Sequence, residues 1–317
     1  MLAYMLKRVL YTIPIALGVT VVSFALVHLA PGDALNAIAP ADAPEEVINA
    51  LREAYGLDRP LIVQYALWLM HAVQGDLGTS IATGRPVVGE VLKAVGNTLL
   101  LAGVAALIGV VIGCILGAVA GYYHGSLLDR MATGSSVIGV SIPHYWLGLV
   151  LTICFSIWLP LFPAMGAGPG GSSAWQWDWE HMRYLVLPAF TLAVIPMGII
   201  TRTVRALVSD TLQQEFVTAL QARGLSGRRI FFHVVKNTAP TVLAVAGLQV
   251  GYLMGGSILV ETVFAWPGTG FLLNAAIFQR DMPLLQGTIL VLCMFFVVLN
   301  LLVDILQPLI DPRMGRA

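Results

Sequence analysis

The chain alternates between long apolar runs, which lack charged side chains, and shorter polar segments. A bilayer core is about 30 Å thick, and a helix of roughly 20 apolar residues spans it. Six runs reach that length: residues 9–32, 94–128, 131–177, 184–201, 237–260 and 282–303. The third run is long enough for two passes, but its Gly/Ser/Pro-rich part at 166–173 cannot be lipid-exposed helix, so we count one span and a loop. The pattern predicts an all-α membrane protein with six transmembrane helices.

The polar segment at 31–93 follows the first run and has helical patterns of its own. We expect a short, charged amphipathic helix over 43–55 and a second helix over 60–73, with Pro60 in its first turn. This segment is expected to cap the outer mouth of the helix bundle. A loosely ordered connector is the alternative, although the apolar content is high for a linker.

Composition and charge agree with a membrane protein and predict its orientation. Hydrophobic residues make up 58% of the chain and charged residues 11%, against about 45–50% and about 25% in soluble proteins. With the N-terminus inside, 11 of the 17 Lys and Arg residues lie on the cytoplasmic side and 6 on the outer side, as the positive-inside rule favours. Both termini are therefore expected in the cytoplasm. The first run is too long for the core of a signal peptide, about 7–15 residues, and is expected to remain as a helix.

Several isolated residues are expected to have structural roles. The zero net charge gives no indication of a nucleic-acid partner. The odd, dispersed set of cysteines argues against disulfides and a metal cluster, and favours small packing residues. The tryptophans of the loop before the fourth run are typical of aromatic anchors at a membrane surface. These residues are Cys114, Cys154 and Cys293, and Trp175, Trp177 and Trp179.

The polar segment at 201–240 holds six of the seventeen basic residues and reads as helix, glycine break, helix. A loop that only joins two spans needs no such amphipathic block, so contact with another protein is its expected purpose. Gly224 permits a sharp reversal with positive φ, and the short helix after it could then project into a cleft on a cytoplasmic partner. The alternative is a basic amphipathic helix lying on anionic lipid headgroups.

This block resembles the coupling loop of ATP-driven import permeases, whose motif is Glu-Ala-Ala, three residues, then Gly, with a proline at the next helix. The equivalent positions run from Thr218 to Gly224, followed by Pro240, and the Glu-Ala-Ala part is degenerate. The peptide-import branch typically ends in Ala-Arg/Lys-Gly-Leu, as residues 222–225 do. The resemblance implies an ATPase-coupling role for Glu215, Ala219, Ala222, Arg223, Gly224, Leu225, Arg228, Arg229 and Phe231.

The resemblance covers nearly the whole chain, which is similar to the first of the two permease subunits of dipeptide/oligopeptide ABC importers. Matching blocks lie at 7–8, 30–33, 51–53, 55–60, 74–80, 97–98, 141–148, 255–257, 261–270, 280–283, 286–287, 300–301, 304 and 311–313. One departure is Gln307, where the family often has Tyr. The resemblance implies a type I importer permease fold with an N-terminal helix at 1–30, an outer helical segment at 31–93 and a five-helix core at 94–317 that carries the coupling loop at about 202–239.

The block at 261–270 combines an acid, two aromatic residues and a proline-glycine turn just after the fifth span. It is expected to fold back as an outer gate or docking loop, since non-helical backbone at membrane depth must be buried in protein or face water. An ordinary packed turn with a belt tryptophan is the alternative. The gate candidates are Glu261, Phe264, Trp266, Pro267, Gly268, Arg280 and Asp281, with Arg280 and Asp281 most simply forming surface pairs.

Polar residues inside or beside the spans are costly in lipid and should face protein or water. Asn300 and Asp304 lie one helical turn apart on the sixth span, where structural pairing is favoured over substrate contact. His28 and His144 are expected to be hydrogen-bonded structural groups rather than proton relays.

Motifs that the chain lacks limit its function. It has no G-x-x-x-x-G-K-[ST] loop, no H-E-x-x-H pair and no G-x-S-x-G elbow, so it has no recognisable nucleotide, metal or nucleophile site. The resemblance implies a non-enzymatic subunit of a bacterial cytoplasmic (inner) membrane importer, without a cofactor of its own. ATP and Mg would be bound by two cytoplasmic ATPase subunits, and a second permease, an external substrate-binding protein and membrane lipid would be the other partners. A secondary transporter and an intramembrane enzyme are the alternatives. Dipeptides, oligopeptides, glutathione, nickel chelates, opines and oligosaccharides all remain open as solutes.

Overall fold

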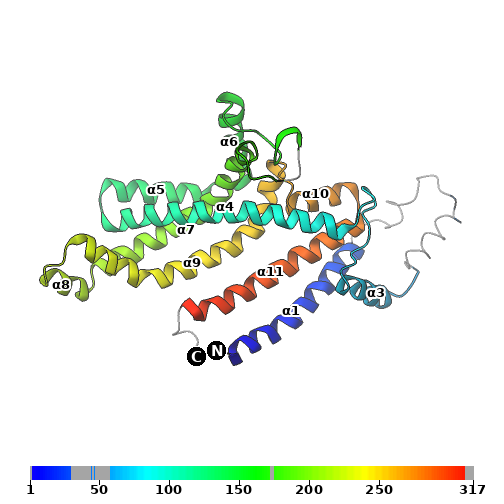
Figure 1. Cartoon of the computed structure of the whole chain (residues 1–317), viewed down its shortest axis with the longest axis horizontal. Coiled ribbons are helices and arrows are strands. Elements are labelled where there is room, and N and C mark those ends of the chain that lie inside the picture. Colours follow the sequence, from blue (N-terminus) through cyan, green and yellow to red (C-terminus); the bar gives the residue numbers. More distant parts are fainter. Residues whose placement is uncertain (1, 30–43, 45, 47–57, 172–174, 311–317) are drawn as a thin grey trace. The chain divides into compact units, whose positions relative to one another are not determined.

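A computed structural model of the chain describes residues 2–29, 44, 46, 58–171 and 175–310, without the side chains of 2–7, 27–29, 254 and 302–310. Almost all of the predicted helix at 43–55 lies outside the described residues, whereas the predicted helix at 60–73 is present with Pro60 as its N-cap. The α-helices are α1 (Leu2–Leu29), α3 (Leu61–Val73), α4 (Val87–Tyr122), α5 (Leu127–Ser141), α6 (His144–Thr152), α7 (Trp179–Leu212), α8 (Glu215–Ala222), α9 (Gly227–Val263), α10 (Thr269–Gln279) and α11 (Met282–Ile310) (Figure 1).

Five of the described helices are long and apolar enough to cross a membrane: α1, α4, α7, α9 and α11. A sixth candidate combines α5 with α6 and the π-helical turn η2 (Ile153–Trp158), which are bent by 103°. The break falls at Ile142 and Pro143, where Ile142 is extended and Pro143 has φ −61°, because proline disfavours helical backbone in the residue before it. The third predicted span is therefore present as a broken helix rather than a straight one.

The chain forms two compact units, of which the first comprises residues 1–97 and 267–301. In this unit Val87, Val91, Ala276 and Leu284 form a buried core. The hydroxyl of Thr20 on α1 lies 2.8 Å from the hydroxyl of Tyr65 on α3. The turn before α4 is pinned by a two-residue bridge between Thr79 and Pro86.

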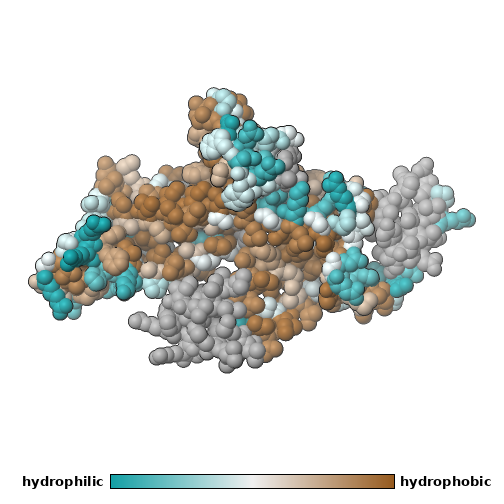
Figure 2. Space-filling model, viewed as in Figure 1, coloured by the Kyte–Doolittle hydropathy of each residue, from teal (hydrophilic) through white to brown (hydrophobic). Residues whose placement is uncertain are grey.

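The second unit comprises residues 98–266 and 302–317, and close helix packing dominates it. Gly113, Gly117 and Gly121 form one face of α4 against α7. A Cβ at Gly117 would lie 2.6 Å from the carbonyl oxygen of Thr201 and 2.7 Å from Cβ of Val204. Small residues at spacing four allow such backbone contact between membrane helices. Helices α4, α5 and α7 accordingly run alongside one another (Figure 1), and apolar residues cover the visible side of α4 and α5 whereas polar residues gather around α8 (Figure 2).

Candidate functional site: coupling loop and gate

The predicted helix–glycine–helix pattern is present at α8 and the start of α9. Gly224 has φ +74°, its amide donates to the carbonyl of Gln221, and the amide of Leu225 donates to the carbonyl of Leu220. These two bonds form a Schellman motif at the end of the helix. The residue after the C-cap of this motif has a left-handed backbone, which glycine adopts most easily. One expectation is wrong: the short helix is α8, before the glycine, and α9 after it has 37 residues. The start of α9 is continuous with the predicted span, so no separate short helix follows Gly224.

Helix α8 has two distinct faces. Val217 is 1% exposed and packs in a core with Val208 of α7 and Ile230 and Val234 of α9, with Phe231 and Leu225 beside it. The other face is exposed and carries Glu215, Ala219 and Ala222, three of the predicted coupling residues. Two more, Arg223 and Gly224, follow the helix and are exposed as well. A short helix held by its apolar face on two longer helices presents its polar face as a fixed surface. This geometry suits contact with another protein.

A buried ion pair holds the turn between α4 and α5, and the sequence reasoning missed it. Asp129, 3% exposed, receives hydrogen bonds from Nε and Nη2 of Arg205 on α7, the latter at 2.9 Å. The Gly125 amide donates to the same carboxylate at 2.9 Å and the Thr133 hydroxyl at 3.2 Å. A bidentate pair of this kind holds the two side chains in one orientation, in addition to the attraction between their charges. The available signal was that Asp129 is the only acidic residue between Glu90 and Asp178.

The gate candidates of the second unit lie around the end of α9. Glu261 is fully buried and accepts a 2.7 Å hydrogen bond from the Thr98 hydroxyl. Phe264 is 2% exposed and Trp266 is fully buried, so Trp266 is not a belt residue. The helix ends in a second Schellman pattern, in which Ala265, with φ +45°, holds the left-handed position. An L-residue with a side chain is strained there.

The same turn is covered by residues from two other segments of the second unit. The Gly166 amide donates to the carbonyl of Phe264 at 2.8 Å, and a Cβ at Gly148 would lie 3.0 Å from the Phe264 ring. The ring of Trp175 lies 5.7 Å from that of Trp266, at an interplanar angle of 55°. The predicted surface anchors therefore divide: Trp177 and Trp179 are largely exposed, whereas Trp175 packs inward.

The gate candidates of the first unit lie around α10. Pro267 accepts a 2.8 Å hydrogen bond from the Asn97 amide group, and Gly268 is the N-cap of α10. Arg280 is exposed, but Asp281 is fully buried, so the expected surface pair is wrong. The Asp281 carboxylate accepts hydrogen bonds from the Ser80 hydroxyl at 2.5 Å and from the amides of Ala82 and Leu284. A buried carboxylate satisfied by three donors is a structural clamp.

Comparison with known proteins shows the family of the chain. The family model for the binding-protein-dependent transport system inner membrane component matches residues 109–316. The chain belongs to this family. The model for the N-terminal part of such membrane components matches residues 1–101. The predicted family and its all-α permease fold are thereby confirmed, and the secondary-transporter alternative is not favoured.

Curated relatives match this transport component from end to end. It is 36% identical to the dipeptide transport system permease protein DppB of Alkalihalophilus pseudofirmus, over 99% of both chains. It is equally 36% identical to the oligopeptide transport system permease protein AppB of Bacillus subtilis, over 99% of both chains. The glutathione transport system permease protein GsiC of Salmonella typhimurium is 36% identical over 98% of both chains.

The structure describes the side chains of two of the polar residues singled out in this permease component, His144 and Asn300. Nε2 of His144 is buried without a hydrogen-bond partner among the described residues, because its ring packs beside Gly256 and Leu192. Asn300 donates to the carbonyl of Phe296 in its own helix. The side chains of His28 and Asp304 lie outside the described residues. The hydrogen bond expected of His144 is therefore not seen at Nε2 within the described residues.

Proposed function

We propose that this permease component is one of two membrane subunits of an ATP-driven importer for di- and oligopeptides or related small solutes. The exposed face of α8 is the observation that carries the proposal, since it offers one of two cytoplasmic ATPase subunits a surface fixed to α7 and α9. The names of the relatives, which include dipeptide, oligopeptide and glutathione permeases, support a peptide-like solute. An external binding protein would deliver that solute at the opposite side of the membrane.

In the proposed mechanism, ATP-driven closure of the ATPases moves α8 and the loop at 202–239. Because α8 shares a buried core with the end of α7 and the start of α9, it cannot move without them. The far end of α9 carries Glu261, and Phe264 and Trp266 lie in the turn that follows it. These residues would open or close the outer side of the path. Both termini and α8 would lie in the cytoplasm, as the distribution of basic residues predicts.

A pull-down from native membranes in mild detergent tests the proposal, with Gly224→Pro as the variant. Gly84→Pro is a matched control, because both glycines are left-handed, both have open space at the Cβ position, and both amides donate to a backbone carbonyl. We expect the wild type and Gly84→Pro to bring down a second permease and P-loop ATPases. Gly224→Pro should retain the permease and lose most of the ATPases.

Two results would contradict this proposal. If Gly224→Pro retains the ATPases as the wild type does, α8 is not the coupling contact. If the wild-type chain comes down alone even after crosslinking, it works without an ATPase, and uptake should then follow an ion gradient instead of ATP.

A further inference from the structure

Residues 159–168, which we call the strap, follow the π-helical turn η2 and have no regular secondary structure. The first part of the strap is fixed. The amides of Leu161 and Phe162 donate to the carbonyl of Phe155, at 2.9 and 3.1 Å. The guanidinium of Arg183 on α7 donates to the carbonyl of Leu161 at 2.7 Å. The strap therefore starts from a point that is held by η2 and α7.

The last part of the strap is tied to residues 264–266, which we call the gate turn. Among the backbone amides of 163–168, only that of Gly166 donates to a backbone carbonyl within the described part of the chain. The acceptor is the carbonyl of Phe264, at 2.8 Å. Gly166 has φ +96°, a conformation that residues with a side chain resist. Ala167 beside it is fully buried. This end of the strap thus lies against the gate turn through one backbone hydrogen bond.

The backbone of the gate turn is strained. Ala265 has φ +45°, and its Cβ makes left-handed backbone unfavourable. The side chains on both sides of Ala265 are buried, with Phe264 2% exposed and Trp266 0% exposed. Strained backbone persists where the surrounding structure holds it. The observed turn therefore depends on the contacts that cover it, and the strap supplies one of them.

We propose that the strap is a latch that keeps the gate turn closed, in the arrangement in which Phe264 and Trp266 are buried. When the hydrogen bond between Gly166 and Phe264 breaks, the strap lifts and Ala265 leaves the left-handed region. The strain at Ala265 favours this opening and the strap opposes it, so the turn has two states that a small motion can bias. The inference rests on the proposed function of the gate and adds what holds the gate shut.

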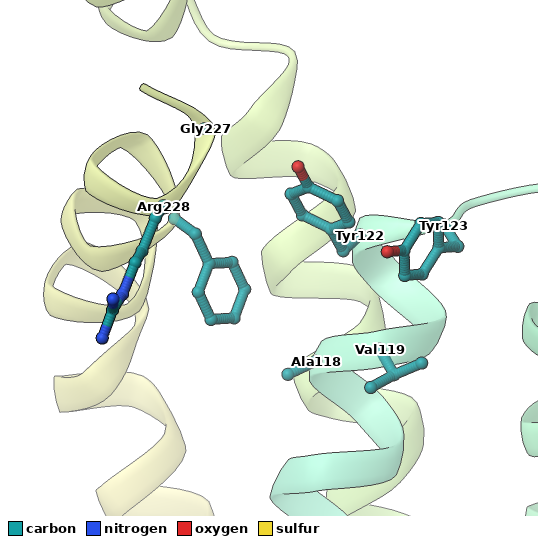
Figure 3. A pocket seen from close by; sticks show the side chains of 7 residues that line it. Ala118, Val119, Tyr122, Tyr123, Gly227 and Arg228 are labelled. Carbon is teal, nitrogen blue, oxygen red and sulfur yellow. The ribbon is translucent and has the colours of Figure 1, made fainter. Parts of the chain in front are cut away.

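Motion at the start of α9 would bias the latch, because the gate turn follows the other end of the same helix. Figure 3 shows Arg228 on α9 and Tyr122 and Tyr123 at the end of α4, on opposite sides of an open depression of about 330 Å³. The described side chains leave this space unfilled, so the first turns of α9 can shift towards α4. The far end of α9 would then pull on the strap at Gly166.

Labelling of a buried cysteine measures how often the strap lifts. The reporter is Ala167→Cys, with Cys114, Cys154 and Cys293 replaced by alanine, in the full chain with its co-purifying subunits in nanodiscs. A polar maleimide reaches this cysteine only while the strap is lifted, so the labelling rate follows the open fraction. Ala265→Gly removes the strain that favours opening. We expect it to slow labelling about fivefold, which corresponds to about 1 kcal/mol.

Matched variants test the same balance from the other side. Gly148→Ala places a Cβ 3.0 Å from the ring of Phe264 and should speed labelling, because it crowds the closed turn. Gly134→Ala, on a helix of the same unit, meets nothing within 4 Å and should leave the rate unchanged. Met165, also in the strap, is 63% exposed, so Met165→Cys should be labelled quickly in every variant and controls for access of the reagent. Hydrogen exchange of peptides that cover 159–168 needs no reporter cysteine and should change in the same direction.

The inference is overturned if Ala265→Gly leaves the labelling rate unchanged, or if Ala265→Gly and Gly148→Ala change it in the same direction. A non-hydrolysable ATP analogue with Mg tests the proposed function separately, because it should speed labelling of the reporter chain. If the nucleotide has no effect while the two variants still act in opposite directions, the strap is a latch and the proposed ATPase coupling is wrong. If the nucleotide speeds labelling and Ala265→Gly does not slow it, the coupling stands and the strap is not the latch.

Discussion

Two substitutions that each remove the contact between Asp129 and Arg205 are predicted to lower the free energy of unfolding by different amounts. Arg205→Ala leaves a carboxylate that is 3% exposed, with the Gly125 amide and the Thr133 hydroxyl as hydrogen-bond donors and Nδ1 of His124 3.5 Å away. Breaking a buried pair in this way costs about 3–5 kcal/mol. Because two donors remain, we expect about 3 kcal/mol, the lower end of that range.

Asp129→Asn perturbs the same contact differently. The amide keeps the shape of the carboxylate and an acceptor for Gly125, and it leaves Arg205, whose side chain is 28% exposed, free to turn towards water. The loss of hydrogen bonds to a charged group in Asp129→Asn should then lower the free energy of unfolding by about 1.5 kcal/mol. The double variant should cost less than the sum of the two single changes, because both remove one interaction.

The assay is reversible unfolding in mixed dodecyl maltoside and SDS micelles, followed by circular dichroism. Arg202→Ala is the control, since Arg202 is an exposed basic residue of the same helix and should change stability by no more than about 0.5 kcal/mol. The reasoning is refuted if Asp129→Asn costs as much as Arg205→Ala, or if the double variant is additive.

Two further predictions concern backbone geometry. Ala265→Gly should stabilise the protein by about 1 kcal/mol and Gly224→Ala should destabilise it by a similar amount, because both residues are left-handed. If both substitutions change the stability in the same direction in the same unfolding assay, this prediction is wrong. Gly117→Ala should cost about 1–3 kcal/mol by overpacking, since its Cβ would lie 2.6 Å from the Thr201 carbonyl oxygen. Gly103→Ala on the same helix meets nothing within 4 Å and should be neutral or stabilising by up to about 1 kcal/mol; a loss of stability there would refute the packing argument.

Features that depend on local pattern were predictable from the sequence. The apolar runs located the membrane helices because backbone groups in lipid must be satisfied within one helix. Gly224 between two amphipathic stretches located the end of α8, since the left-handed turn is a property of a few adjacent residues. The length of α9 was not predictable in the same way. Its first turns are polar and basic, so the hydropathy pattern separates them from the apolar span that continues the same helix.

Features that depend on distant partners were not predictable. Asp129 and Arg205 are 76 residues apart, and Ser80 and Asp281 are 201 residues apart. A single sequence gives no register between helices, so a charged residue beside a span is read as a surface group unless its partner is known. For that reason Asp281 was expected at the surface although it is fully buried.

The continuity of α9 changes how the two candidate sites relate to each other. At a rise of 1.5 Å per residue, its 37 residues extend about 55 Å, from the turn after Gly224 to the turn at Phe264. Each end is fixed: Ile230 and Val234 lie in the core shared with α8, and Phe264 is held by Gly166 and Gly148. Pro240 interrupts the hydrogen-bond ladder between these ends, because it has no amide proton. In the proposed mechanism, motion at the coupling loop therefore needs no relay of side chains to reach the gate. It needs only that α9 tilt as one body or bend at Pro240.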